Sequence, residues 1–344
     1  MAMQALNQDA DLISIIAPAY NEEDGLEEFV RRIDAVMTGS GWTYEIVFVN
    51  DGSTDRTLAV MQALRAQNAN ITVVNLSRNF GKEIAMTAGI AHALGDALVV
   101  IDTDLQDPPE VIPELVQEWR TGYDVVYGQR SERAGETWLK KATARWFYRL
   151  IKRMGPVAIP ENTGDFRLLS RRAAQALLQI PERHRFMKGL YAWIGFRQKA
   201  VMYKRQARFA GTTKWNYWKL WNLAIEGVTS FTIVPLKLAT YLGFSMALFA
   251  FGFGLFIVGK AIFFGEEVRG YPTMMALMLL LGGVQLIVLG LIGEYLGRVF
   301  NETKQRPLYL LESVSWSSAA ARANERPAAV HRRTPVAIGR GRAE

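Results

Sequence analysis

Two long uncharged segments in the last third of the chain restrict the folds open to it. The first has 22 residues between Lys237 and Lys260, and the second has 24 residues between Arg269 and Glu294. Roughly 20 consecutive apolar residues cross a bilayer as an α-helix, whereas a core helix of a water-soluble protein is rarely so long and so uniformly apolar. The sequence therefore predicts two transmembrane helices within residues 233–300, joined by a short outer loop.

The charges around these segments predict their orientation. Six basic residues flank them and outnumber the nearby acids: Lys214, Lys219, Lys237, Arg298, Lys304 and Arg306. The connecting loop has two basic and two acidic residues, and so no net charge. Basic flanks stay on the cytoplasmic side, and the first residues lack the basic start and apolar run of an export signal. We therefore expect a multi-pass protein of the inner membrane whose N-terminal domain and two termini are cytoplasmic.

Two further segments have the composition of membrane-surface helices. Residues 137–154, TWLKKATARWFYRLIKRM, contain no acid and place four basic residues along one helical stripe. This pattern suits the headgroup region of an anionic leaflet, although an ordinary amphipathic surface helix would show it too. Residues 213–232 include three tryptophans and a tyrosine just before the first apolar segment. Because Trp and Tyr gather at membrane surfaces, we expect an interfacial helix over 137–154 and a second interfacial segment over 213–232.

Residues 1–212 have the alternation of an α/β domain. Short apolar runs, which predict buried strands, alternate with amphipathic patterns such as EDGLEEFVRRIDAVM, which predict helices. The predicted strands are LISIIAPAYN, YEIVFVNDGS, ITVVNLS and ALVVIDTD. The helix after the second strand should begin after Ser53 or Thr54, either of which can act as its N-cap. This order predicts a mostly parallel sheet with helices on both faces.

Polar side chains follow three of these strands, at the edge where parallel sheets bind ligands. They are Tyr20, Asn21 and Glu22 after the first strand, Asn50 and Asp51 after the second, and Asp102 and Asp104 after the fourth. So many acids would concentrate negative charge unless a cation or a donor-rich ligand lies there. Hard oxygen ligands favour Mg²⁺ or Mn²⁺, which commonly bridge phosphates. An isolated Asp-Xaa-Asp is more often a turn, so its neighbours carry this prediction.

Several kinds of site are excluded or disfavoured. The chain has no cysteine, which excludes disulfides, thiolate metal sites and cysteine nucleophiles, and its three histidines lie too far apart in sequence to suggest a zinc site. Neither a Gly-Xaa-Gly-Xaa-Xaa-Gly after the first strand nor a Gly-Lys-Ser/Thr loop is present, which argues against a dinucleotide dehydrogenase and a P-loop enzyme. The NFGKE segment at 79–83 reads as a turn, with Lys82 at most a secondary phosphate contact.

The formal charge of +7 owes much to the C-terminal tail. Residues 301–344 are predicted to be a cytoplasmic tail that is disordered from about residue 315, where arginine, alanine and proline replace any apolar periodicity. Contact of this tail with anionic lipid is the alternative to an idle solvated segment. The remaining basic residues gather near the membrane-facing segments, so we expect no nucleic-acid partner.

Four motifs, in this order and ahead of the two apolar segments, carry a family resemblance. They are PAYNEE (18–23), VNDGSTD (49–55), DTDLQDPPE (102–110) and NTGDFRLLSRR (162–172). Over about residues 10–312 the chain resembles the polyprenyl-phosphate glycosyltransferases of glycosyltransferase family 2, which include dolichyl-phosphate mannose synthases and bactoprenol glucosyltransferases. The two apolar segments bring it nearest to the bactoprenol branch.

The resemblance implies a GT-A fold, which binds a nucleotide-sugar, and an inverting transfer of one sugar to a lipid phosphate. Carried over by position, Mg²⁺ or Mn²⁺ would be held by Asp102, Asp104 and Gln106, and Asp104 would act in catalysis through the metal. The implied donor contacts are Pro18, Tyr20, Asn21, Glu22, Asp51, Asp102, Arg205 and Arg208. Asp107 would shape the following loop. The family often has aspartate where this chain has Asn50, so we assign no role to that position.

The acceptor that the resemblance implies is a polyprenyl phosphate such as undecaprenyl phosphate. Its phosphate would contact Arg130 and Lys141, with Lys140 as the alternative to Lys141. Asp165 resembles the residue proposed as the family's base, and two other roles are open to it: orienting the acceptor, or pairing with Arg167. A phosphate monoester has a second pKa of about 6, so the acceptor is largely ionised at neutral pH. A strong base is therefore less necessary than it would be for a sugar hydroxyl.

Two other functions stay open at this point. A processive polysaccharide synthase shares the fold, but it should show Gln-Xaa-Xaa-Arg-Trp and more spans, whereas Arg145-Trp146 is preceded by Ala142 at the glutamine position. A catalytically silent membrane scaffold would not need Asp102, Asp104 and Asp165. The sequence does not fix the sugar; UDP-glucose or another UDP-hexose is expected from the bactoprenol branch alone, and relatives suggest a homo-oligomer.

Overall fold

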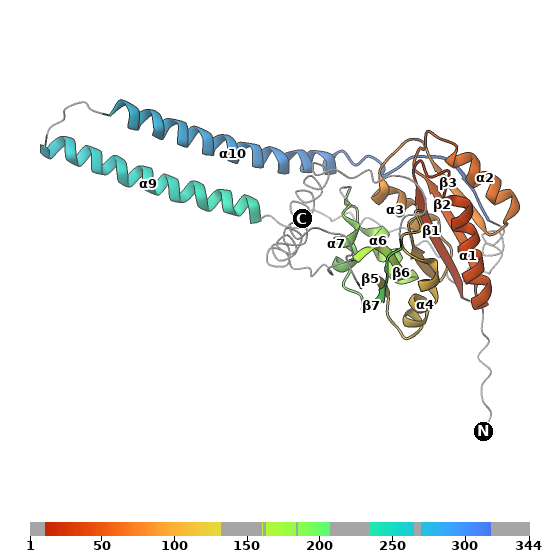
Figure 1. Cartoon of the computed structure of the whole chain (residues 1–344). Helices are drawn as coiled ribbons and strands as arrows, with labels where there is room; N and C mark the ends of the chain where they lie inside the picture. The colour runs from red at the N-terminus through yellow and green to blue at the C-terminus, as the bar shows by residue number, and fades with distance from the viewer. Residues whose placement is uncertain are drawn as a thin grey trace, which may run out of the picture.

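The computed structural model describes residues 11–131, 160, 163–183, 185–206, 234–264 and 270–317. The predicted interfacial segments at 137–154 and 213–232, and with them Lys141 and Arg208, lie outside this part of the chain. Within it, an α/β domain is followed by two long helices that extend away from the domain side by side (Figure 1).

The described residues form one eight-stranded sheet with the strand order β7-β5-β6-β4-β1-β2-β3-β8. Its strands are β1 (Leu12–Ala19), β2 (Thr43–Asn50), β3 (Ile71–Leu76), β4 (Ala97–Val100), β5 (Val125–Arg130), β6 (Thr163–Ser170), β7 (Gln198–Tyr203) and β8 (Leu311–Ser315). The four strands predicted from the sequence, β1 to β4, pair in parallel, whereas β6 and β8 run antiparallel to their neighbours. The prediction of a mostly parallel sheet is confirmed.

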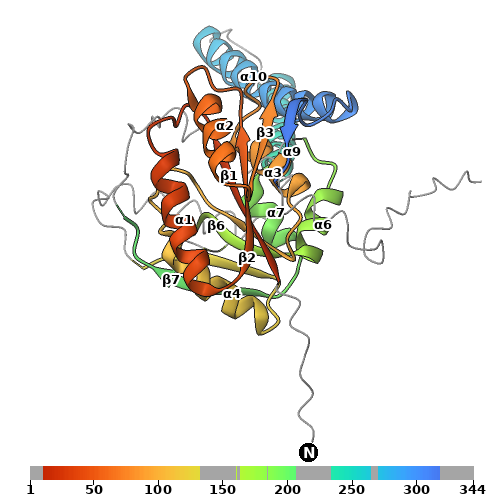
Figure 2. The ribbon, with the colours of Figure 1, turned by 90° about the vertical axis from the view of Figure 1, so that its right-hand side faces the viewer.

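Helices cover both faces of this sheet, because alternate residues of each strand point to opposite faces. In β1, Ile13 and Ile15 are fully buried in one core cluster and Ile16 in the other. The first cluster includes residues of α1 (Leu26–Ser40), α2 (Thr57–Gln67) and α4 (Ile112–Arg120), which follows the 3-10 turn η1 (Pro109–Val111). The second includes residues of α3 (Lys82–His92), α6 (Arg171–Gln179) and α7 (Met187–Trp193) (Figure 2). Burying each such isoleucine contributes about 1.5–3 kcal/mol, so both layers hold the sheet.

The two predicted apolar segments are helical. They form α9 (Val234–Phe264) and α10 (Tyr271–Thr303), which contact one another and expose large apolar side chains such as Phe244 and Ile287. Among the described residues, Leu280–Thr303 has the length and hydropathy of one membrane span, and Ala239–Phe253 is a shorter apolar helix. That both helices cross a membrane therefore stays a prediction.

The chain returns from α10 to the sheet, which the sequence did not lead us to expect. β8 adds an antiparallel strand to β3, within the segment predicted to be a tail. Beyond the strand, Arg65 donates to the carbonyl of Trp316 at 2.9 Å, and the N–H of Ser317 donates to Thr72 Oγ1 at 2.9 Å. β8 covers a sheet edge that would otherwise present unpaired backbone groups. The tail was predicted to be disordered from about residue 315, but residues 315–317 are placed by these contacts, and the residues after 317 lie outside the described part of the chain.

The predicted N-cap of α2 is wrong. This helix begins at Thr57, and neither Ser53 nor Thr54 caps it. Both residues instead bind the loop after β1: the N–H of Asn21 donates to Ser53 Oγ at 3.1 Å, and the N–H of Thr54 donates to Asn21 Oδ1 at 2.8 Å. The hydroxyl and amide groups near residue 53 are therefore used to join two loops rather than to begin the helix locally.

Candidate active site

The loops that follow β1 and β2 are fastened together at the carboxyl edge of the sheet. In addition to the bonds of Asn21, the N–H of Glu22 donates to Thr57 Oγ1 at 2.9 Å. Asn21 has a φ of 54°, in the left-handed region that asparagine adopts more readily than most residues. Tyr20 is 37% exposed beside it, whereas Pro18 is buried within β1. The donor contacts predicted at residues 20–22 thus lie on one well-fixed loop.

Asp51 ties the second motif to the loop before α3. It is 3% exposed, and its two carboxylate oxygens accept the N–H groups of Phe80 at 2.7 Å and Gly81 at 2.9 Å. Burial raises the pKa of Asp51, and these two hydrogen bonds oppose that rise. Gly52 has a φ of 63°, and a Cβ there would lie 2.3 Å from the backbone carbon of Arg78, so the close approach requires glycine. Contact of Asp51 with a nucleotide base stays a prediction.

Asn50 links the same motif to the C-terminal strand. Its Nδ2 donates to Asn75 Oδ1 at 2.8 Å, and its Oδ1 accepts the N–H of Ser53 at 3.2 Å. Asn75 in turn donates to Glu312 of β8 at 2.9 Å. An ionised aspartate at position 50 could not donate to Asn75. Asn50, which departs from the family pattern, therefore supports the hydrogen bond by which Asn75 holds β8.

Lys82 joins two of the predicted site acids. It is the first residue of α3, and its Nζ lies 2.7 Å from the carboxylate of Asp102, which follows β4, and 2.7 Å from Asp165 Oδ2 in β6. Ammonium-carboxylate bonds of this length are among the stronger hydrogen bonds in proteins. The sequence had suggested at most a secondary phosphate contact for Lys82. In the structure it is the centre of an ion-paired cluster formed by Lys82, Asp102 and Asp165.

Asp165 is held as an anion in this cluster. Burial alone would raise its pKa, but the nearby ammonium groups of Lys82 and Lys188 outweigh burial and hold the pKa of Asp165 below its usual range. Its second oxygen, Oδ1, is buried and has no hydrogen-bond partner among the residues that the structure describes. Arg167, weighed as its ion-pair partner, instead donates to the backbone carbonyls of Gly164 at 2.7 Å and Asp165 at 3.4 Å. The partner of the Asp165 carboxylate is Lys82.

Glu83, beside Lys82, behaves differently. Its Oε2 accepts the N–H of Met187 at 3.2 Å, which ties α3 to the start of α7. Burial first, and then the negative charge of Asp165, raise the pKa of Glu83 to about 8. Glu83 therefore holds a proton over much of the neutral range, so that the charge of Asp165 is not opposed by a second ionised carboxylate.

The loop after β4 presents hard oxygen ligands and is held in a strained conformation. Leu105 has a φ of 57° although it is not glycine, and it is 1% exposed in the first core cluster, which fixes its neighbours Asp104 and Gln106. The N–H of Gln106 donates to Asp104 Oδ1 at 3.1 Å, and Arg205 donates to Gln106 Oε1. Gln106, a predicted metal ligand, is thus in contact with Arg205, a predicted diphosphate contact.

The acids and amides at this edge suit a divalent ion only together with further ligands. Among the described residues, no group of three or more His, Cys, Asp or Glu side chains could hold a metal by itself. Mg²⁺ is usually bound by one or two carboxylates together with substrate phosphates and waters, so a full protein cage is not required. Because Asp102 is paired with Lys82, the donor set of Asp104 and Gln106 fits an ion that is shared with a bound diphosphate.

The guanidinium of the predicted acceptor contact Arg130 lies near Gly164, the residue before Asp165 in β6. Its Nη2 is 3.7 Å from Asp107 Oδ1, and its Nε donates to the hydroxyl of Tyr203 at 3.3 Å. Tyr203 also donates to Asp107, which is 2% exposed. A Cβ on Gly164 would lie 2.9 Å from Arg130 Nη2, so the guanidinium rests against the residue that precedes Asp165. Asp107 thus anchors Arg130, a function that the loop-shaping role predicted for it did not include.

Comparison with known proteins places this site in a family. Residues 14–178, which include all four sequence motifs, match the family described as glycosyl transferase family 2, and residues 234–299 match the GtrB C-terminal hairpin. A glycosyltransferase of Synechocystis is 55% identical over 302 residues, which cover 88% of this chain and 95% of that protein. The chain belongs to glycosyltransferase family 2. It is accordingly a glycosyltransferase, and its α/β domain is GT-A-like, as the resemblance implied.

Other similar proteins carry more specific names. A prophage bactoprenol glucosyl transferase homolog of Escherichia coli is 45% identical over 88% of this chain and 99% of its own length, and a bactoprenol glucosyl transferase of Shigella phage SfX is 46% identical over the same shares. Glucosyl-3-phosphoglycerate synthase from Mycobacterium tuberculosis, solved with Mn²⁺, uridine diphosphate and phosphoglyceric acid, aligns with a TM-score of 0.44 at 22% identity, covering 64% of this chain and 78% of that one. That last alignment is too weak to assign ligands to this chain.

Proposed function

We propose that this glycosyltransferase transfers one sugar, with inversion, from a nucleotide-sugar to a polyprenyl phosphate at the cytoplasmic face of a membrane. The names of the bactoprenol glucosyl transferases, which match nearly their full length, support a polyprenyl-phosphate acceptor. UDP-glucose or another UDP-hexose is the donor we propose, and undecaprenyl phosphate the acceptor.

The position of Lys82 between Asp102 and Asp165 is the main support for this proposal. The ammonium of Lys82 lies 2.7 Å from Asp102, beside the candidate donor loop, and 2.7 Å from Asp165, whose chain neighbour Gly164 lies near the candidate acceptor contact Arg130. A reaction between two phosphate-bearing substrates needs cationic groups at both of them and a short distance between them. The cluster and its neighbours Arg130 and Arg205 supply that combination at the carboxyl edge of one sheet.

In the reaction, an oxygen of the acceptor phosphate forms a bond to C1 of the sugar while the bond from C1 to the donor diphosphate breaks. The electron pair of that bond leaves with the nucleoside diphosphate. Arg205 and Lys82 are the described cations that we assign to the growing negative charge. A divalent ion bound at Asp104 and Gln106 would act as a Lewis acid on the same diphosphate.

We assign Asp165 a positioning role rather than that of a base. Its pKa is held below the usual range because Lys82 and Lys188 outweigh burial, so the carboxylate has little affinity for a proton. The acceptor phosphate has a second pKa of about 6 and is already ionised at neutral pH. We propose that Asp165 keeps Lys82 in place, and that Arg130 orients the acceptor phosphate next to it.

The proposed membrane arrangement follows from the helices and their charges. Helices α9 and α10 are proposed to cross the inner membrane as a hairpin, with both termini and the α/β domain in the cytoplasm. The apolar tail of the acceptor would then remain in the bilayer while its phosphate reaches the domain. The proposed interfacial segments at 137–154 and 213–232 would hold the domain at the headgroup layer.

The test uses membranes that contain the chain, undecaprenyl phosphate and a divalent ion. Each of UDP-glucose, UDP-N-acetylglucosamine, UDP-galactose and GDP-mannose is supplied with a radiolabelled sugar, and label in the extracted lipid is measured. We expect labelled lipid with one UDP-hexose and its loss when EDTA is added. Absence of labelled lipid with every donor would refute the proposed acceptor.

A pair of matched variants tests the assignment of the metal loop. Asp104→Asn should abolish lipid labelling while the chain still inserts into membranes. Asp11→Asn removes a carboxylate that pairs with Arg120 ahead of β1, and it should leave labelling unchanged. Full labelling by Asp104→Asn would contradict the role given to that residue.

A further inference from the structure

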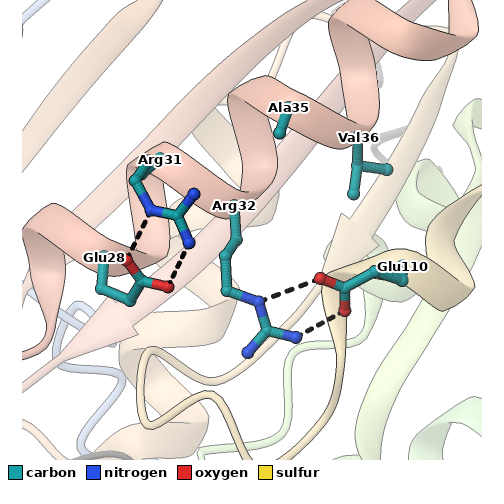
Figure 3. Close-up of a pocket in the computed structure, with 6 residues that line it drawn as sticks. All are labelled: Glu28, Arg31, Arg32, Ala35, Val36 and Glu110. Atoms are coloured by element: carbon teal, nitrogen blue, oxygen red, sulfur yellow. Dashed lines mark hydrogen bonds and ion pairs between the residues drawn. The ribbon is translucent and has the colours of Figure 1, made fainter.

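A surface groove along α1 contains two consecutive arginines with different partners (Figure 3). Arg31 forms a bidentate ion pair with Glu28, one turn away on the same helix, at 2.6 and 2.7 Å, and its side chain is 68% exposed. Arg32 forms a bidentate pair with Glu110, which lies 78 residues away in η1, at 3.0 and 2.5 Å, and its side chain is 16% exposed. The first pair stabilises only its own helix, whereas the second connects distant parts of the chain.

Arg32 also reaches the segment after β7. Its remaining nitrogen, Nη1, donates to Gln206 Oε1 at 3.2 Å. The three nitrogens of one guanidinium therefore hold two segments. These are η1, which follows the loop of Asp104 and Gln106, and the segment that contains Arg205. Glu110 responds to this contact, because the hydrogen bonds from Arg32 lower its pKa although partial burial opposes the change.

The two segments are bonded to each other as well. The N–H of Gln206 donates to the carbonyl of Gln106 at 3.0 Å, and the Arg205 side chain donates to Gln106 Oε1. Removal of Arg32 would leave these bonds without support from α1, and each segment could then move relative to the other. Gln106 and Arg205 are the residues we assigned to the donor diphosphate and its metal ion.

We propose that Arg32 is a positioning residue of the donor site, which fixes Gln106 and Arg205 relative to each other by clamping Glu110 and Gln206 to α1. This inference rests on the proposed function only in naming the donor as the ligand that benefits. A clamp of this kind lowers the entropy that the segments lose when the donor binds, so its removal raises the KM for the donor more than it lowers kcat. A lysine cannot replace it, because the ammonium has no fork that could bond Glu110 and Gln206 together.

The first experiment compares Arg32→Ala and Arg32→Lys with the matched control Arg31→Ala. We expect both Arg32 variants to raise the KM for the nucleotide-sugar about fivefold, the effect of losing an interaction of about 1 kcal/mol, with the KM for the lipid phosphate unchanged. Arg31→Ala should retain the wild-type KM. An unchanged donor KM in the Arg32 variants, or an equal rise in Arg31→Ala, would overturn the proposal.

The second experiment does not depend on turnover. Hydrogen exchange of the donor-free, detergent-solubilised chain should show the Gln206 N–H exchanging about fivefold faster in Arg32→Ala than in the wild type and in Arg31→Ala, because its bond to Gln106 opens more often. Binding of UDP with Mn²⁺ should weaken by the same factor. If the wild type fails to label any lipid, the proposed acceptor falls, while these two measurements still decide the role of Arg32; unchanged exchange and unchanged UDP binding would refute it.

If Arg32→Ala does not fold, Gln206→Ala removes the bridge to that segment and leaves the pair between Arg32 and Glu110 in place. It should still raise the donor KM, by less than Arg32→Lys does, whereas a purely structural role of Arg32 in holding η1 against α1 predicts no change. A wild-type donor KM in Gln206→Ala would therefore also contradict the proposal.

Discussion

Replacement of Lys82 by methionine removes the ammonium from the ion-paired cluster and keeps an unbranched side chain. It leaves the carboxylates of Asp102 and Asp165, whose side chains are 28% and 13% exposed, without their shared cation. Removal of one partner from a buried ion pair costs about 3–5 kcal/mol. Because the Lys82 side chain is 45% exposed, water screens part of this loss, and we expect about 2 kcal/mol at neutral pH.

In Lys82→Met, the contribution of Asp165 to the pH dependence of stability should have the opposite sign to its contribution in the wild type. In the wild type, the pKa of Asp165 lies below its usual range, because Lys82 and Lys188 outweigh burial. The ionised Asp165 therefore adds stability above the pKa of an unfolded aspartate, and this stability is lost as the pH falls through the folded pKa. Without Lys82, burial and the charge of Asp102 would raise that pKa. The variant should then lose stability as the pH rises above about 4.

Thermal unfolding of the detergent-solubilised chain, followed by tryptophan fluorescence at pH 5 and pH 8, measures both effects. For a domain of this size, a loss of about 2 kcal/mol corresponds to a fall in Tm of roughly 4–8 °C. The fall in Lys82→Met should be larger at pH 8 than at pH 5. Lys199→Met, which removes a lysine of β7 that lies over the ring of Tyr123, is the matched control and should change Tm little. A Tm of Lys82→Met equal to that of the wild type at pH 8 would show that Lys82 does not stabilise this cluster.

Two further predictions concern neighbours of this cluster. The pKa of Glu83 is raised to about 8, so the wild type should lose roughly 2–4 kcal/mol of stability as the pH rises from the ordinary glutamate pKa toward 8. Glu83→Gln should flatten that decline in unfolding scans across this pH range. An unaltered decline would contradict the raised pKa of Glu83. Gly52→Ala places a Cβ 2.3 Å from the backbone of Arg78 at a φ of 63°, and should cost about 2 kcal/mol or more in chemical denaturation; a wild-type midpoint would show that the loop is free to shift.

The framework of the α/β domain was predictable because it follows from local patterns. The apolar runs that form β1 to β4 are buried on both faces, and such runs identify the strands of a parallel sheet without knowledge of their partners. The polar residues after these strands could be assigned to one edge for the same reason. The helices α9 and α10 were predictable from the length of their uncharged segments.

The ion-paired cluster was not predictable, because it is made by contacts that no local pattern reveals. Lys82 is separated from Asp102 by 20 residues and reaches Asp165 in β6, within the fourth motif. Its position directly after Gly81, at the start of a helix that faces the carboxyl edge, was the one signal in the sequence. Arg32 gave even less indication, since Arg31 and Arg32 look alike in sequence and differ only in the partners that the fold supplies.

The wrong N-cap of α2 and the unpredicted strand β8 have related causes. Ser53 and Thr54 have the side chains of an N-cap, but hydrogen bonds to Asn21 in the loop after β1 take precedence. β8 is a short segment, LESVS, whose strand conformation depends on pairing with β3 and on the link from Glu312 to Asn75. Propensity alone does not identify an edge strand that forms only where a partner is available.

We propose that the donor diphosphate lies at the carboxyl edge of the sheet, between Asp104 and Arg205, with Arg130 beside it for the acceptor phosphate. Anomalous scattering from Mn²⁺ in crystals of the full chain grown with UDP locates the diphosphate most directly. We predict one manganese peak in contact with Asp104, with the diphosphate in contact with Arg205. A peak elsewhere, or a diphosphate away from this edge, would contradict this placement of the donor.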